Sequence, residues 1–301
     1  MTDWLAGIEG TAAGHHLAMI LALTSALAHA LFGALQKGRH DPWLTRGAID
    51  LSYGLMALPV ALFVFPLPSP RLWLVMIGVF VLHAAYKWLL AMAYSRAAYT
   101  VVYPVVRGTA PVVTVLAAGI VFSEHFTPMQ WAGTALVSLA ILGLAAFNLR
   151  KVTVGREALV TALGLAVATG ILTSAYTVYD AFGIRLAANP FTFLAWFFVI
   201  DGLLLFPWVA LHRWRRMDNP PAPGPLLLRG FVGGLLGFVS FGAVMMATRL
   251  DKVGEAAVLR ETSTVFAAAI GWLFLREAVG PVRALLMALI AAGAVIVELG
   301  G

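Results

Sequence analysis

An arginine and a glutamate 17 residues apart occur twice in this chain, and the repetition constrains its fold more than any other feature. Adding 153 to the residue numbers carries Arg107 to Arg260 and Glu124 to Glu277. In both copies the arginine lies inside a long apolar run. A helix of this length rises about 25 Å, so each arginine is expected deep in an apolar layer and each glutamate near one of its faces. The chain is therefore predicted to contain two halves with one plan, residues 1–150 and 151–301.

The composition places these halves in a membrane. Hydrophobic residues make up 61% of the 301 positions and charged residues only 11%, which is not expected of a water-soluble domain of this size. We predict an all-α polytopic membrane protein. The apolar runs of membrane-spanning length are Leu17–Leu35, Ala48–Phe65, Leu72–Tyr94, Val101–Phe122, Trp131–Phe147, Ala158–Tyr179, Phe191–Leu211, Phe231–Ala247, Ala256–Leu275 and Ala284–Leu299.

Each half holds five of these runs, and an odd number makes the second half cross the membrane in the opposite sense. The fold class is thus about ten transmembrane helices in two inverted five-helix repeats around a central cavity. Inverted repeats suit a secondary transporter, because a site between them opens to either side through nearly equivalent conformations. Duplication alone also permits a stable bundle that transports nothing, so a non-transporting membrane scaffold stays open as an alternative.

Several function classes are excluded by what the sequence lacks. The short connections leave no room for a soluble catalytic domain, and zero Cys excludes disulfides and thiolate metal sites. The sequence has no His-Glu-x-x-His, Gly-x-Ser-x-Gly or Walker-type Gly-x-x-x-x-Gly-Lys motif. We therefore predict no enzyme activity, no cofactor and no metal site.

The formal charge of +6 is interpreted as topology-setting loop charge rather than a nucleic-acid surface. Most basic loop residues fall in connections on the side opposite the N-terminus. They are Lys37, Arg39, Arg46, Arg150, Lys151, Arg156, Arg213, Arg215, Arg216 and Arg229. This bias places both chain ends outside the cytoplasm. The protein is expected to be a multi-pass protein of the cell inner membrane, with the lipid bilayer as a partner.

Cations within the spans indicate a polar interior. A charged side chain at the depth of Arg107 or Arg260 costs about 2.5 kcal/mol or more unless it is paired or hydrated. Two interpretations follow, and they are compatible. The arginines form static ion pairs with Asp50, Asp201 or Glu261, or at least one guanidinium binds an anionic group of the cargo.

Other polar side chains recur at helical spacing on faces that must point inward. His83, Tyr86 and Lys87 share one side of the third helix, and Tyr176 lies one turn before Asp180 in the sixth. Asp180 is a proton site, a partner of an arginine or the polar end of its span. The predicted substrate-binding residues are His83, Tyr86, Tyr103, Arg107, Tyr176, Asp180, Arg260 and Glu261, and the candidates for proton coupling are Asp180, Glu261 and His83.

Four motifs also carry a family resemblance: His29-Ala-Leu-Phe-Gly-Ala-Leu-Gln-Lys37, Tyr103-Pro-Val-Val-Arg-Gly108, Tyr176-Thr-Val-Tyr-Asp-Ala-Phe-Gly-Ile-Arg185 and Leu259-Arg-Glu-Thr-Ser263. Together they resemble the EamA branch of the drug/metabolite transporter superfamily over essentially the whole chain. The resemblance implies ten helices, a central cavity and transport of small organic metabolites. Relatives commonly have Trp-Asn where this chain has Phe32-Gly33, so its cargo is expected to differ. The family also implies cytoplasmic termini, against the loop charges.

The function predicted from these observations is secondary transport of a small organic metabolite by alternating access. Export of amino acids or related compounds is the first expectation. A uniporter or an importer of anionic metabolites such as phosphonates is the alternative within the transporter class. The expected partners are a small-molecule substrate, lipid and protons as the coupling ion, without nucleic acid, and the protein is expected to be a monomer or homodimer.

Overall fold

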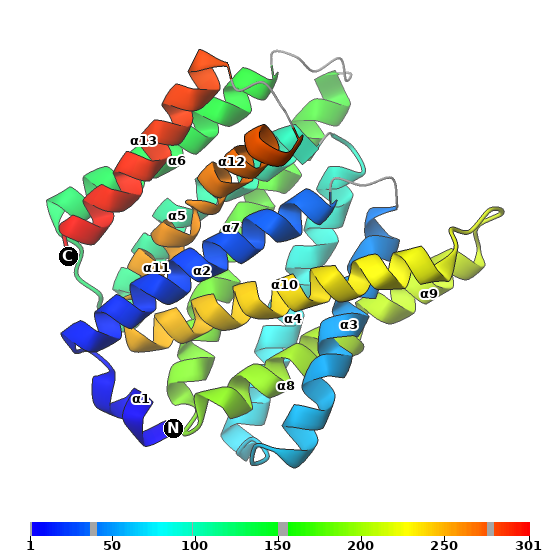
Figure 1. Cartoon of the computed structure of the whole chain (residues 1–301), viewed down its shortest axis with the longest axis horizontal. Coiled ribbons are helices and arrows are strands. Elements are labelled where there is room, and N and C mark those ends of the chain that lie inside the picture. Colours follow the sequence, from blue (N-terminus) through cyan, green and yellow to red (C-terminus); the bar gives the residue numbers. More distant parts are fainter. Residues whose placement is uncertain (1, 37–40, 98, 150–155, 276–279) are drawn as a thin grey trace.

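The computed structural model describes residues 2–36, 41–97, 99–149, 156–275 and 280–301, and this part of the chain is helical with short connections. Glu277 and the loop residues Lys37, Arg39, Arg150 and Lys151 lie outside it. The helices, labelled in Figure 1, are α1 (Thr2–Ile8), α2 (Ala12–Gln36), α3 (Pro42–Phe63), α4 (Pro70–Tyr94), α5 (Tyr99–Phe122), α6 (Pro128–Leu149), α7 (Arg156–Leu186), α8 (Pro190–Leu203), α9 (Phe206–Arg215), α10 (Pro223–Leu250), α11 (Val253–Arg260), α12 (Ser263–Leu275) and α13 (Pro281–Leu299).

These helices make ten crossings of the membrane, as predicted. Within the described residues, eight segments are long and apolar enough to span by themselves, and one of them joins α8 to α9. The remaining crossings are α3, whose first turns carry Arg46 and Asp50, and the interrupted pair α11 and α12. The short helix α1 precedes the first crossing. Both chain ends consequently lie at one face, called here the termini face, and the other is called the opposite face.

Prolines in the connections begin helices. The helices α3, α4, α6, α8, α10 and α13 start at Pro42, Pro70, Pro128, Pro190, Pro223 and Pro281. A proline suits the first turn, where its missing N–H has no partner to lose. The preceding residue caps three of these helices: Asp41 accepts from Trp43 N at 2.8 Å, Ser69 from Leu72 N at 3.3 Å and Asn189 from Phe191 N at 2.9 Å. The turns that separate the apolar runs are therefore also the helix starts.

Several crossings differ in extent from the predicted apolar runs, and three of these differences bear on the site. The ninth, predicted as one helix over Ala256–Leu275, is broken at Glu261 and Thr262. The seventh, predicted over Phe191–Leu211, is interrupted between α8 and α9. The sixth continues to Leu186 instead of ending at Tyr179, so Asp180 lies inside a helix. The apolar pattern did not reveal the breaks, because each break lies inside a run that is long and apolar enough to be read as one span.

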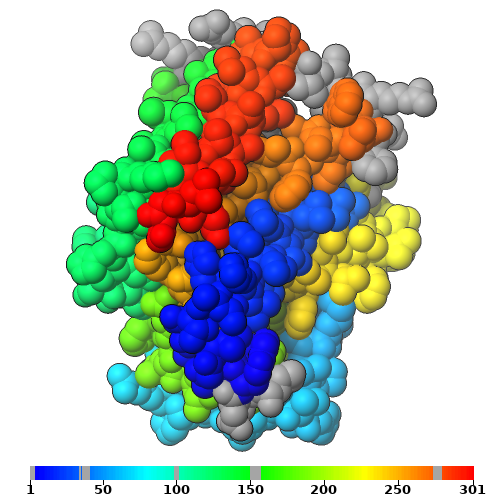
Figure 2. Space-filling model, turned by 60° about the vertical axis from the view of Figure 1, so that its left-hand side comes forward, coloured from blue at the N-terminus to red at the C-terminus, as the bar shows by residue number. Residues whose placement is uncertain are grey.

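Helices of the two halves interleave. The first crossing of each half packs along the third crossing of the other, so α2 lies against α10 and α7 lies against α4. The second crossings pack together as α3 against α8, and the last as α6 against α13. Figure 2 shows α2 at the surface between α12 and α10, and α13 beside α6. This exchange of equivalent contacts is the arrangement expected of inverted repeats.

The outward-facing side chains are apolar. Phe63, Ile120 and Leu139 are 85%, 82% and 67% exposed, and exposed leucines, isoleucines and valines recur on most of the long helices. A soluble protein rarely exposes so much apolar surface, whereas the lipid tails of a bilayer solvate it well.

Two glycines bring the last crossings of the halves into backbone contact. A Cβ added at Gly293 of α13 would lie 2.7 Å from Val137 Cγ2 and 2.8 Å from the carbonyl oxygen of Gly133 in α6. A Cβ added at Gly133 would lie 2.7 Å from the carbonyl oxygen of Gly293. Small residues at such crossings let helices approach closely in a membrane, where packing replaces the hydrophobic effect.

We predict that Gly293→Ala lowers the unfolding free energy by about 1–3 kcal/mol, because the new methyl group meets backbone that cannot move aside. Gly164→Ala in α7 is the matched control, since a Cβ there has no atom within 4 Å. Thermal unfolding of the purified proteins in detergent measures the effect. Equal midpoints for Gly293→Ala and the parent would contradict the close contact.

Candidate functional site

A cavity of about 230 Å³ lies between helices of both halves. It extends from Tyr176 and Phe241 in the middle of the bundle to the first turns of α3 and the end of α4, at the opposite face. Its lining comprises His29, Phe32, Gly33, Pro42, Thr45, Arg46, Ile49, Tyr86, Lys87, Leu90, Ala91, Tyr94, Ala97, Tyr103, Val106, Arg107, Thr173, Tyr176 and Phe241. The volume suits a small metabolite, because cavities for drug-sized ligands occupy about 300–1,000 Å³.

The cavity wall combines cations with rings. The charged side chains in it are Arg46, Lys87 and Arg107, and the described lining includes no Asp or Glu. The aromatic side chains in it are Phe32, Tyr86, Tyr94, Tyr103, Tyr176 and Phe241. Such a wall offers donors and positive charge to an anionic group, and apolar faces to the rest of a bound molecule.

Arg107 of α5 reaches the break between α11 and α12. Its Nε lies 3.0 Å from Glu261 Oε2, and its Nη2 donates to Ser263 Oγ at 3.0 Å. The Nη2 atom also donates to the free carbonyl oxygen of Arg260 at 3.4 Å. The guanidinium lies 5.8 Å from the centre of the Tyr103 ring. The broken helix therefore supplies the polar groups that a buried arginine requires.

A second set of buried charges forms the floor of the cavity on α3, α4 and α8. Lys87 Nζ lies 2.7 Å from both Asp50 Oδ2 and Asp201 Oδ1, and donates to the Tyr53 hydroxyl at 3.0 Å. Tyr53 in turn donates to Asp201. Arg46 Nε lies 2.7 Å from the other oxygen of Asp50. Two cations and two carboxylates balance in this set, as burial in a membrane requires.

His83 of α4 connects this floor to α7. Its Nε2 lies 2.8 Å from Asp180 Oδ2, and its Nδ1 lies 3.8 Å from Asp201 Oδ1. The imidazole is only 1% exposed and packs against the ring of Tyr176, with centroids 4.4 Å apart. His83 therefore lies between a carboxylate of α7 and a carboxylate of α8.

A smaller cavity of about 10 Å³ lies beyond Tyr176 and Phe241, which line both cavities and so separate them. Arg260 and Asp180 face it. Arg260 lies 4.8 Å from the centre of the Phe241 ring, and its Nε and Nη2 have no hydrogen-bond partner in the described part of the chain. Asp180 Oδ1 is likewise unpartnered there. A cavity of this volume holds about one water molecule. The large cavity is therefore continued on this side only by a nearly closed space, which polar groups line.

Contacts between the halves close the termini face beyond this small cavity. Glu124, in the connection from α5 to α6, lies 3.2 Å from Arg185 Nη2 of α7. Its carboxylate also accepts from Val253 N at 2.8 Å and Gly254 N at 3.2 Å, at the start of α11. A carboxylate at a helix N-terminus is stabilised by the free N–H groups. Glu124 thereby connects the first half to α7 and α11 of the second half at this face.

The eight residues predicted from the sequence gather around the two cavities. Tyr86, Tyr103, Arg107 and Tyr176 line the large cavity. Tyr176, Asp180 and Arg260 line the small one. His83 and Glu261 lie behind the walls and pair with Asp180 and Arg107. Of the predicted static pairs, Arg107 with Glu261 is present, and Arg260 has no ion pair within the described residues.

The prediction for Arg46 was wrong. The sequence analysis counted it as loop charge, but it lies in α3 and lines the cavity. Its spacing of one turn from Asp50 is the signal that identifies it, because residues at i and i+4 share a helix face. The sequence also assigned no site role to Lys87 or His29, both of which line the cavity.

Comparison with known proteins agrees with this geometry. The sequence profile of the EamA-like transporter family matches residues 16–146 and 160–299, which is most of the chain. A protein of known crystal structure, whose description names no function, has the same fold with a TM-score of 0.73 and 18% sequence identity. The match covers 94% of this chain and 97% of that chain. No curated protein sequence gave a match.

We predict that Lys87→Met lowers the unfolding free energy by about 3 kcal/mol or more, because it leaves buried carboxylates uncompensated. Adding Asp201→Asn should recover much of the loss, since Arg46 still pairs with Asp50. Thermal unfolding of purified protein measures both effects. Arg213→Met removes an ion pair whose arginine is 49% exposed and serves as the control, with an expected loss below about 1 kcal/mol. A double variant less stable than Lys87→Met would contradict the charge balance.

Proposed function

Because this chain belongs to the EamA-like transporter family, we propose that it moves a small organic metabolite across the membrane by alternating access. Its two halves rock about the central cavity, which faces one side of the membrane at a time. The transporter class and the membrane location follow from the family. The mechanism, the substrate class and the coupling are our proposals.

One observation carries the mechanism: the path across the bundle is wide on one side of Tyr176 and Phe241 and nearly closed on the other. The large cavity extends toward the opposite face, and the small cavity ends below the contacts of Glu124 with Arg185 and α11. Those contacts join the first half to the second, so a relative movement of the halves would break them. The same movement would join the two cavities on the side of the termini face.

The groups that face the cavity support an anionic substrate, although each wall cation pairs with a carboxylate behind the wall. Three cations and no carboxylate belong to the described lining, and six aromatic side chains supply apolar surface. A carboxylate or phosphonate with an apolar or aromatic body would place its charge near Arg107 and its body against rings such as Tyr103 and Tyr176. This favours anionic metabolites over zwitterionic amino acids, whose ammonium group finds no carboxylate on the wall.

Amino acids are the second candidate, because of one further observation. Asp180 lines the small cavity beside Tyr176, and its Oδ1 has no hydrogen-bond partner in the part of the chain that the structure describes. A movement of this ring would expose the carboxylate to the ammonium group of a bound amino acid. Arg260 faces the same small cavity, where its Nε and Nη2 have no hydrogen-bond partner among the described residues, and its guanidinium would then receive the carboxylate.

Proton coupling is proposed for the pair of His83 and Asp180. His83 lies between Asp180 of the second half and the cavity floor around Lys87, so a movement of α7 against α4 changes the partners of the imidazole. A proton bound in one state and released in the other would couple transport to a proton gradient. Glu261 is the other candidate, since it is buried beside Arg107.

The substrate proposal is tested with the double variant Arg107→Gln, Glu261→Gln, which removes a cation from the wall without leaving its partner unpaired. Binding to the native state raises its stability, by about 2.7 kcal/mol at a ligand concentration of 100 Kd. We expect aromatic carboxylates or phosphonates to raise the thermal midpoint of the parent and of the exposed control Arg216→Gln. The double variant should lose this shift. A compound that raises the midpoint of the parent should also be transported by the parent into or out of proteoliposomes.

Three results would count against the proposal. An equal rise of the thermal midpoint in the double variant would show that Arg107 does not bind the substrate. Shifts by amino acids only would favour the second candidate. A compound that binds but is never transported, with protein correctly inserted, would favour a membrane scaffold.

A further inference from the structure

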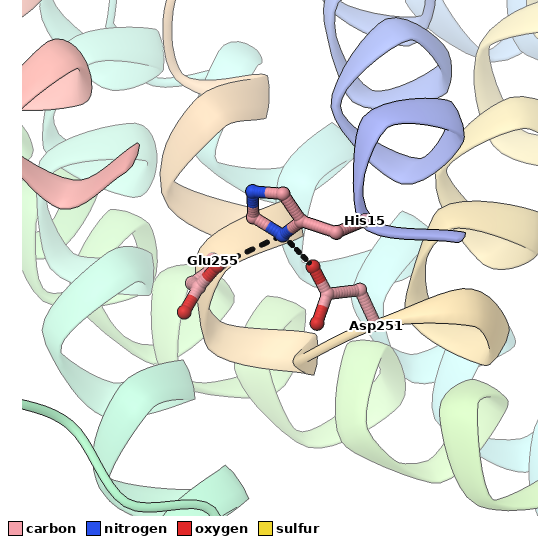
Figure 3. A group of neighbouring side chains, drawn as sticks. All are labelled: His15, Asp251 and Glu255. Carbon is pink, nitrogen blue, oxygen red and sulfur yellow. Dashed lines mark hydrogen bonds and ion pairs between the residues drawn. The ribbon is translucent and has the colours of Figure 1, made fainter. Parts of the chain in front are cut away.

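Three potential metal ligands converge at the termini face, outside both cavities. Figure 3 shows His15, in the first turn of α2, pointing toward Asp251 at the end of α10 and Glu255 in the first turn of α11. His15 Nδ1 is hydrogen-bonded to Asp251 Oδ2 and lies 4.0 Å from Glu255 Oε2. One nitrogen and two carboxylate oxygens thus lie within 4.8 Å of one another. Imidazole with carboxylates is a ligand set that divalent transition metals prefer.

The surroundings orient each ligand toward the common point. His15 Nε2 lies 3.0 Å from Glu298 Oε1 of α13. With the ring proton on Nε2, a metal at Nδ1 would take the place of the hydrogen bond from Nδ1 to Asp251. Metal-binding histidines usually donate their other N–H to a carboxylate in this way. Glu255 Oε1 accepts from Gln130 at 2.5 Å and pairs with Lys252 at 2.8 Å, so Oε2 is the oxygen turned toward His15.

The charge of the cluster also favours a bound cation. Asp251, Glu255 and Glu298 bring three carboxylates together, and Lys252 is the only Lys or Arg side chain paired with any of them within the described residues. Two nearby arginines pair with other carboxylates, Arg249 with Glu9 and Arg185 with Glu124. Arg185 also donates to the backbone carbonyl oxygen of Asp251 at 2.7 Å. When a metal replaces the proton on Nδ1, His15 is neutral and the cluster keeps two negative charges, which one divalent ion would compensate.

We propose that His15, Asp251 and Glu255 bind a divalent transition-metal ion, with Glu298 as the residue that positions His15. The His15 side chain is 35% exposed and Asp251 is 20% exposed, so the ion enters from solvent. The sequence analysis predicted no metal site, because ligands at positions 15, 251 and 255 form no spacing motif.

A metal ion at this position is expected to affect transport, an inference that rests on the proposed function. His15 belongs to the first half, whereas Asp251 and Glu255 belong to the second. A metal bound to all three holds the halves together at the termini face, alongside the contact of Glu124 with Arg185. Bound metal is therefore expected to slow the opening of this face.

The test is titration of Zn²⁺ into the purified full-length protein, prepared without a histidine tag, by isothermal calorimetry. We expect one saturable site per chain and at least tenfold weaker binding in His15→Gln. Glu298→Gln should weaken binding about tenfold or more without removing a ligand. His16→Gln is the matched control, because this neighbouring histidine is exposed and its ring centroid lies 6.0 Å from that of His15. It should bind as the parent does.

Absence of saturable Zn²⁺ binding, or unchanged binding in His15→Gln, would overturn the metal site. An equal loss in His16→Gln would assign the binding to surface histidines and overturn it as well. Because His15→Gln also loses ion pairs, its fold is checked by size exclusion, and Glu298→Gln provides the second, conservative variant. Slowed transport with Zn²⁺ in the parent and not in His15→Gln supports the gating consequence. A protein that binds Zn²⁺ but transports nothing contradicts the proposed function and leaves the metal site intact.

Discussion

A charge inside the hydrocarbon layer must be paired, and this requirement decides how the two halves of the bundle are held together. Lys87 of α4 lies between Asp50 of α3 and Asp201 of α8. Arg107 of α5 lies against Glu261, where the ninth crossing is broken. Each set joins the first half to the second. The cavity lies between these sets, so the charges that stabilise the bundle also form the polar part of its wall.

The two faces of the bundle differ although the halves share one plan. The segment around Arg107 is a continuous helix in α5, whereas its counterpart around Arg260 is broken between α11 and α12. The break turns free backbone groups and Glu261 toward Arg107, and it leaves the Arg260 guanidinium at the small cavity. One repeat therefore adopts two conformations in the same structure. An exchange of these conformations between the halves is the movement that alternating access requires.

The sequence predicted the parts of this structure that depend on local patterns. The apolar runs predicted the ten crossings. Arg107, Asp180 and Arg260 were identified as interior residues, because a charged side chain within a span must face the inside of the bundle. Patterns within a helix could not show which side chains meet across the bundle. Arg46 was therefore taken for loop charge, and the break at Glu261 lies within an apolar run. The cluster of His15 with Asp251 depends on contact between residues 236 positions apart.

The most direct test of the account is the accessibility of single cysteines, since the chain has none of its own. Thr173→Cys lies in the wall of the large cavity and Val244→Cys in that of the small one. A membrane-impermeant thiol reagent at the opposite face should label the first and spare the second. From the termini face, Val244→Cys should become labelled only when Glu124→Gln weakens the contact with Arg185. Equal labelling of both cysteines from one face, with or without Glu124→Gln, would contradict a path that opens to one side at a time.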